Sequence, residues 1–220
     1  YTRRGSQFTL GLKITPPYSL IKGTTDAQYA QMTTSEKYNL LEYHKWKFSG
    51  KVFTPLSADS KLVLMARAEF GYLGHYNKNV KSPFESYYMG GDGMSSYSSY
   101  STEYIAMRGY QSGSLTPYDP ATGRNMGYVF NKFTMELRYP IALEQNATIW
   151  ALAFVEAGNC FADIRDYNPF NLKRSAGIGV RLFLPMFGLM GIDWGWGFDP
   201  INGSTQYGGS QFHFVLGQEL

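Results

Sequence analysis

The stretch VFNKFTMELRYPI, residues 129–141, alternates between apolar and polar side chains. Its positions form two sets: Phe133, Met135, Leu137 and Tyr139 in one, and Lys132, Thr134, Glu136 and Arg138 in the other. Successive side chains of a β-strand point to opposite faces, so this period of two predicts a strand with one apolar and one polar face. A helix would repeat its apolar residues every three or four positions, and this stretch does not.

Similar alternation recurs along the chain and gives about eight predicted strands in all. The other seven are QFTLGLKIT, KWKFSGKVF, LVLMARAEFGY, ATIWALAFVEAG, SAGIGVRLFL, GLMGIDWGWGF and QFHFVLGQEL. Most are ~9 to 12 residues long, whereas strands of soluble sheets usually have ~5 to 6. A strand tilted by about 45° needs ~9 to 11 residues to cross a bilayer with an apolar face toward lipid. The sequence therefore predicts an all-β fold, a transmembrane antiparallel β-barrel; a soluble β-sandwich with one wet face is the alternative.

The connections between the predicted strands differ in length. PPYS, PLSADS and LPMFG are typical of short turns, whereas residues 75–127 and 199–209 are longer segments. Outer-membrane barrels have short periplasmic turns and longer outer loops. The connections therefore favour the barrel over the sandwich.

The composition agrees with many strands and tight turns. Of 220 residues, 17% are aromatic, 24 are glycine and only 17% are charged, a mix that disfavours a helical protein. The formal net charge is +3 and the 20 Lys and Arg form no basic block, which argues against a nucleic-acid surface. The single Cys160 excludes an intramolecular disulfide and a cysteine-based metal cluster. No apolar run approaches the ~20 residues of a transmembrane helix. No signal peptide is evident, although an outer-membrane protein would carry one at its true start. We therefore expect either a soluble chain or part of a longer protein.

No motif predicts an enzyme, a cofactor or a metal. The Gly-rich residues 90–93 are not a phosphate loop, because neither a helix nor a lysine follows them. Three histidines lack metal-ligand spacing, namely His44, His75 and His213. Four carboxylates lie on separate predicted strands with no sequence reason to form an acid/base pair, namely Glu136, Glu156, Asp193 and Glu219. We expect no bond-making chemistry.

The segment YYMGGDGMSSYSSYSTEYIAMRGY, Tyr87 to Tyr110, is rich in glycine and serine and carries a single arginine near its end. Such a segment has the conformational freedom of a surface loop. Arg108 is then either a solvated charge or a cation that the loop delivers to a carboxylate. The sequence pattern alone leaves both readings open.

Four motifs occur here in an order that resembles the C-terminal half of the transmembrane barrel of a BamA-type outer-membrane protein assembly factor. They are PFESYYMGG with MRGY, then FVEAGN, then RSAGIGVRLFLPMFGLMGIDWGWGF, and finally FHFVLGQEL. The resemblance implies that residues 1–220 are the C-terminal part of one sixteen-stranded barrel domain, which periplasmic domains precede. It also implies that the long loop at about 75–127 folds back into the barrel.

The resemblance further implies a latch between the loop tip, formed by Arg108, Gly109 and Tyr110, and an inward-facing carboxylate. Glu156 is the expected partner and Asp193 the alternative. The motif that carries Glu156 also includes Phe154 and Gly158. Glu156 stands where the family usually has aspartate, and residues 94–106 look like extra length before the tip. An arginine suits a latch because its planar fork can donate two parallel hydrogen bonds to one carboxylate.

The last predicted strand is similar to the C-terminal recognition signal of outer-membrane barrels. Phe212, Phe214 and Leu220 share its apolar face, and Gly217 interrupts the other face. An unpaired strand edge is a template for another strand, and a glycine weakens pairing. The resemblance implies a gate here, where the first and last strands separate; alternatively, Gly217 only relieves crowding in a closed barrel.

As a whole, the resemblance implies a non-enzymatic factor that inserts β-barrels into the outer membrane of a Gram-negative bacterium. Its partners would be outer-membrane lipids, unfolded outer-membrane proteins as clients and the accessory lipoproteins of the assembly complex, with no nucleic acid and no cofactor. A polypeptide secretion pore of the same superfamily and a plain porin-like barrel are the alternative functions.

Overall fold

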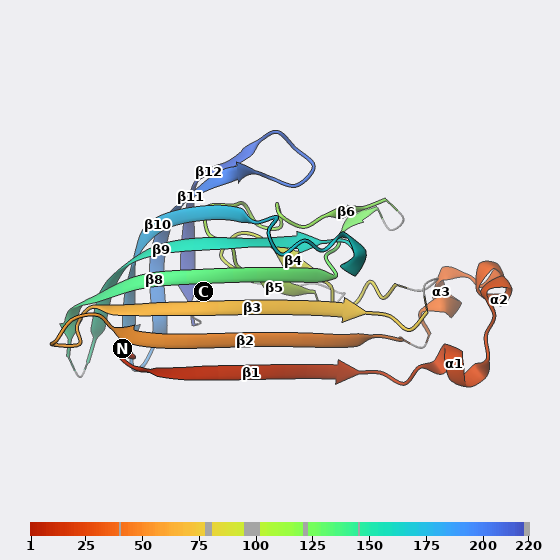
Figure 1. The fold of residues 1–220 in the computed structure, drawn as a ribbon, viewed down its shortest axis with the longest axis horizontal. Coiled ribbons are helices and arrows are strands. Elements are labelled where there is room, and N and C mark those ends of the chain that lie inside the picture. The colour runs from red at the N-terminus through yellow and green to blue at the C-terminus, as the bar shows by residue number, and fades with distance from the viewer. Residues whose placement is uncertain (40, 78–80, 95–101, 121–122, 145, 218–220) are drawn as a thin grey trace.

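The computed structural model of the chain describes residues 1–39, 41–77, 81–94, 102–120, 123–144 and 146–217. Eight long antiparallel strands form one sheet in the order β1-β2-β3-β8-β9-β10-β11-β12 (Figure 1). Their bounds are β1 Gly5–Ile14, β2 His44–Pro55, β3 Val63–Gly74, β8 Val129–Leu143, β9 Thr148–Phe161, β10 Lys173–Leu184, β11 Gly188–Pro200 and β12 Tyr207–Leu216. Within the described residues β1 and β12 do not pair with each other, so the sheet is an open part of a barrel wall.

The two faces of this sheet are inverted relative to a soluble protein. On β8, Lys132, Thr134, Glu136 and Arg138 are at most 3% exposed, whereas the apolar residues between them are 39% to 51% exposed. A soluble sheet would bury its apolar face and leave the charged one in water. A barrel wall with its apolar face toward lipid has this arrangement, which confirms the transmembrane β-barrel and excludes the soluble sandwich.

Short and long connections lie at opposite ends of the sheet (Figure 1). Turns at 56–62, 144–147 and 185–187 join strands at one end, and three longer segments and the short connection 201–206 join them at the other. We call the second end the loop end. It carries 15–43, 75–128, 162–172, which includes the 3₁₀ turn η1 Ile164–Asp166, and 201–206. The predicted longer segment at 199–209 is wrong, because β11 and β12 extend into it.

The prediction of a short turn at PPYS is wrong. Residues 15–43 form a long connection with three short helices, α1 Tyr18–Lys22, α2 Asp26–Gln31 and α3 Thr34–Lys37. Capping boxes open the second and third helices, because Thr25 pairs with Gln28 and Thr33 with Glu36 in the reciprocal pattern. No helix among the described residues is long and apolar enough to cross a membrane.

The segment between β3 and β8, which we call the long loop, has four short strands among its described residues. They are β4 Tyr87–Met89, β5 Glu103–Ile105, β6 Tyr118–Asp119 and β7 Arg124–Asn125. β4 and β5 pair in parallel, so two arms of the loop run side by side. The loop has its own apolar core, in which Met89, Met107 and Tyr110 are buried with Phe130 of β8 and Cys160 of β9.

Candidate functional site

Arg108 of the long loop is fully buried against three strands of the wall. Its Nε and Nη2 donate to Glu156 Oε1 at 3.1 and 2.8 Å, and Nη2 also donates to Glu136 Oε1 at 2.7 Å. Its Nη1 donates to Asp193 Oδ2 at 3.1 Å, and its backbone N–H donates to Glu156 Oε2 at 2.9 Å. The guanidinium therefore joins β8, β9 and β11 through one side chain.

The strands bring these carboxylates together by alternation. Glu136 and Glu156 face inward from adjacent strands, and Asp193 faces inward from β11. Phe154 lies one inward position before Glu156, and the Arg108 guanidinium carbon lies 3.6 Å from the centre of its ring. An arginine stacked on an aromatic face gains a cation–π attraction while its edge remains free to donate hydrogen bonds.

Each of these wall carboxylates also has a cation of the wall as a partner. Lys132 Nζ lies 3.1 Å from Glu156 Oε1. Arg138 donates to Glu136 Oε2 at 2.6 and 2.8 Å, and Arg181 binds both oxygens of Asp193 at 2.5 and 2.6 Å. Arg108 is therefore an additional positive charge on a set of ion pairs that the wall already contains. We call these three pairs the socket.

The socket keeps Arg108 charged. Burial alone would lower the pKa of the Arg108 guanidinium, but the three carboxylates outweigh burial and raise the pKa above its ordinary value. Arginine is protonated in proteins even without such help. The interaction is therefore a fixed ion pair network and not a site of proton transfer.

The backbone of the tip is shaped by glycine. Gly109 has φ +83, and a Cβ there would lie 2.8 Å from the backbone of Trp196 and Gly197 on β11. Its N–H donates to His213 Nε2 on β12 at 2.8 Å. Gly91 holds the tip from the loop side, since its N–H donates to the Tyr110 carbonyl at 3.0 Å. Only a residue without a side chain allows the tip to approach the wall this closely.

Tyr110 completes the tip. Its hydroxyl donates to the Arg174 carbonyl on β10 at 2.8 Å and accepts from the Asp199 N–H on β11 at 3.3 Å. Burial raises the pKa of Tyr110 to about 12, so the hydroxyl stays protonated and can donate. The tip thus contacts five consecutive strands of the wall, β8 to β12.

The structure brings both expected partners to Arg108 at once, where the sequence offered Glu156 and Asp193 as alternatives. It adds Glu136, which the sequence analysis placed on a separate strand without a role, and His213, which lacked metal-ligand spacing. The signal for Glu136 was present, since it lies between Lys132 and Arg138 on one polar face. Gly158 serves packing, because a Cβ there would lie 2.8 Å from Met89 of the loop.

The terminal strand differs in one detail from the prediction. Phe212 and Phe214 are exposed on the apolar face, as the pattern predicts. However, β12 ends at Leu216, so Gly217 lies beyond the strand and does not interrupt it. Gly217 has φ +75, and its N–H donates to the Leu189 carbonyl at 2.7 Å. Leu220 lies outside the described residues.

Among the described residues no group of three His, Cys, Asp or Glu could hold a metal ion. Cys160 is a buried free thiol that packs in the loop core. The site holds the long loop against the barrel wall by charge complementarity.

Comparison with known proteins gives two findings. The sequence matches the Omp85 superfamily domain over residues 4–220. The fold is similar to the crystal structure of BamA from Haemophilus ducreyi lacking POTRA domains 1–3, with a TM-score of 0.63 at 18% identity, over 98% of this chain and 38% of that one. The chain therefore spans little more than a third of that structure. No curated protein matches the sequence.

Proposed function

The chain belongs to the Omp85 superfamily, and from that membership we propose that it is part of a factor that inserts β-barrels into the outer membrane. The superfamily consists of outer-membrane barrels that insert or secrete proteins, and this chain is the C-terminal half of such a barrel in a Gram-negative bacterium. We further propose that its long loop is latched in the lumen and that its last strand is the gate.

The observation that carries the proposal is the docking of Arg108 in the socket. A loop arginine that binds three buried carboxylates fixes both the depth and the orientation of the loop. The same tip binds His213 on β12, so the latch touches the strand that would have to move in a lateral opening. We infer that loop position and the terminal strand are coupled through this contact.

The terminal strand supports the second part of the proposal. In the described chain β12 pairs with β11 alone, from Tyr207 to Leu216, with one register shift between Gly197 and Pro200. A strand edge in lipid must satisfy its N–H and C=O groups, and an incoming strand can do so. We propose that strands of an unfolded outer-membrane protein add at this edge when the barrel opens. Lipids contact the apolar outer face, and accessory lipoproteins bind the complete factor.

The test is Arg108→Ala in the full-length gene, with Arg174→Ala as the matched control. Arg174 lies beside the tip but is 67% exposed and pairs with Asp199 at the surface. We expect Arg108→Ala to lower the level of folded outer-membrane barrels and to increase proteolysis of the loop, while the control changes neither. Normal barrel insertion with an unchanged loop would contradict the latch. Loss of one secreted polypeptide, with barrel levels intact, would instead indicate a secretion pore.

A further inference from the structure

A second ion cluster lies at the loop end, around Lys45 of β2. The Lys45 side chain is only 4% exposed. Its Nζ lies 2.8 Å from Glu103 Oε2 and 3.2 Å from Glu85 Oε2, and it donates to the Glu85 carbonyl at 2.9 Å. It also lies 4.7 Å from the ring centre of Tyr87. One buried ammonium thus contacts both arms of the long loop.

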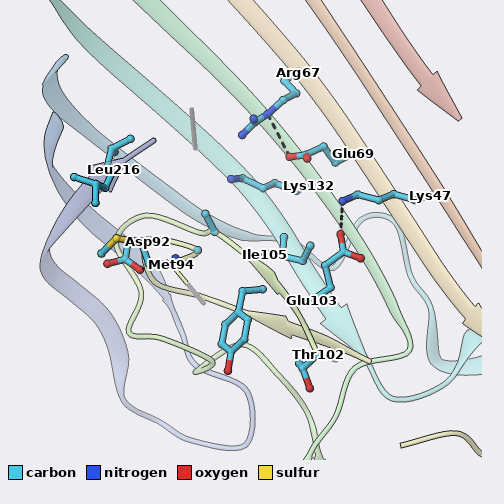
Figure 2. A pocket seen from close by; sticks show the side chains of 14 residues that line it. Lys47, Arg67, Glu69, Asp92, Met94, Thr102, Glu103, Ile105, Lys132 and Leu216 are labelled. Carbon is cyan, nitrogen blue, oxygen red and sulfur yellow. Dashed lines mark hydrogen bonds and ion pairs between the residues drawn. The ribbon is translucent and has the colours of Figure 1, made fainter. Parts of the chain in front are cut away.

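Two further lysines surround this centre. Lys47 of β2 pairs with Glu103, and Lys13 of β1 pairs with Glu85 at 3.0 Å. Figure 2 shows the first of these pairs at the edge of a cavity of about 610 Å³, which lies between the wall and the returning arm. The parallel pairing of β4 with β5 places Tyr87 opposite Glu103, so the lysines meet the two arms where they run together.

We propose that Lys45 is a positioning residue that fixes the two arms of the long loop to the wall, independently of the tip. The cluster of Lys45 and Lys47 with Glu85 and Glu103 is the base clasp, and Lys13 is an exposed partner of Glu85 at its margin. The loop contributes the opposite charge at the two places, since it supplies carboxylates to the base clasp and the cation Arg108 to the socket.

The charge state of the carboxylates agrees with this role. Burial would raise the pKa of Glu103, but the ammonium groups of Lys45 and Lys47 outweigh it and hold the pKa below its ordinary value. Burial would likewise raise the pKa of Glu85, but the ammonium groups of Lys13 and Lys45 outweigh it and lower that pKa. Both carboxylates are therefore ionised at neutral pH and available for the clasp.

The base clasp and the socket are separate in the sheet. The clasp uses β2, whereas the socket uses β8 to β11, and β3 lies between them. They share no residue. Each can therefore open while the other remains closed, and the arms and the tip should respond to different substitutions.

The experiment measures each attachment with its own reporter in the full-length protein, with Cys160→Ala to remove the native thiol. Ser86→Cys reports on the arms and Met107→Cys on the tip, because both side chains are buried when the loop is docked. We expect Lys45→Gln to increase thiol labelling at 86 about tenfold through the loss of charge-assisted hydrogen bonds, and to leave labelling at 107 unchanged. Arg108→Gln should have the reverse effect.

The matched control is Lys13→Gln, which removes a cation from the same Glu85 but at a site that is 62% exposed. Exposed pairs contribute little, so labelling at 86 should change less than twofold. If Lys45→Gln does not fold, Glu103→Gln removes the same contact from the loop side. Unchanged labelling at 86, or equal increases at 86 and 107, would overturn the proposal. The effect of the base clasp on barrel insertion rests on the proposed function. The clasp itself does not, because thiol labelling reports the position of the loop and does not measure insertion.

Discussion

The arrangement of charges predicts that Glu156→Gln destabilises the protein more than Arg108→Gln, although Arg108 makes more hydrogen bonds. When Arg108 is lost, every wall carboxylate keeps its wall cation. The remaining buried charges are then balanced, and because each wall carboxylate stays bonded to its wall cation, we expect a net cost of roughly 1.5 to 3 kcal/mol, the worth of one charge-assisted hydrogen bond. When Glu156 is neutralised, Lys132 is left at 1% exposure without the carboxylate that it binds. Removing one partner of a buried pair costs roughly 3 to 5 kcal/mol.

The measurement is the free energy of unfolding of the full-length protein in urea, followed by tryptophan fluorescence. Adding Lys132→Met to Glu156→Gln removes the unpaired cation, so the double variant should recover about half or more of the lost free energy. A larger loss for Arg108→Gln than for Glu156→Gln would refute the reasoning. Failure of Lys132→Met to restore any stability would refute it as well, because the cost would then not come from an uncompensated charge.

Three further predictions test other parts of the structure. Gly109→Ala should undock the tip and increase labelling of a cysteine at 107, whereas Gly123→Ala, also at positive φ but in open space, should not. The pKa of Glu103 lies below its ordinary value of 4.5 when the arm is docked. Ionised Glu103 therefore contributes fully to docking above pH 4.5, and this contribution is lost as the pH falls through the lowered pKa. Pepsin cleavage of the arms should increase over the same fall in pH. Val155→Lys places a charge on the outer face and should lower the free energy of unfolding in lipid by roughly 2 to 4 kcal/mol, measured in urea with liposome-bound protein.

The eight wall strands follow from the sequence because their signal is local. Alternation assigns residues 132–139 of β8 to the correct faces, and a barrel wall needs only that assignment to be correct. The helical connection at 15–43 does not follow from the pattern PPYS, which is typical of a short turn. The capping patterns that begin at Thr25 and Thr33 were visible in the sequence and were the better guide.

The composition of the socket could be predicted only in part. Arg108 is 28 residues from Glu136, 48 from Glu156 and 85 from Asp193 along the chain. Alternation shows that these carboxylates face inward. Whether they lie at one height depends on the stagger between strands and on how deep the loop reaches, and neither quantity is encoded in a local pattern.

The opposite polarity of the two attachments determines how the loop can dock. At the tip a loop cation meets wall carboxylates, and at the base loop carboxylates meet wall cations. If the loop shifted so that Arg108 approached the base, it would meet Lys45 and not an acceptor. If the arms moved to the socket, Glu85 and Glu103 would meet three carboxylates and compete with them for wall cations that are already paired. Like charges brought together are unfavourable, so charge complementarity selects one placement of the loop and disfavours shifted ones.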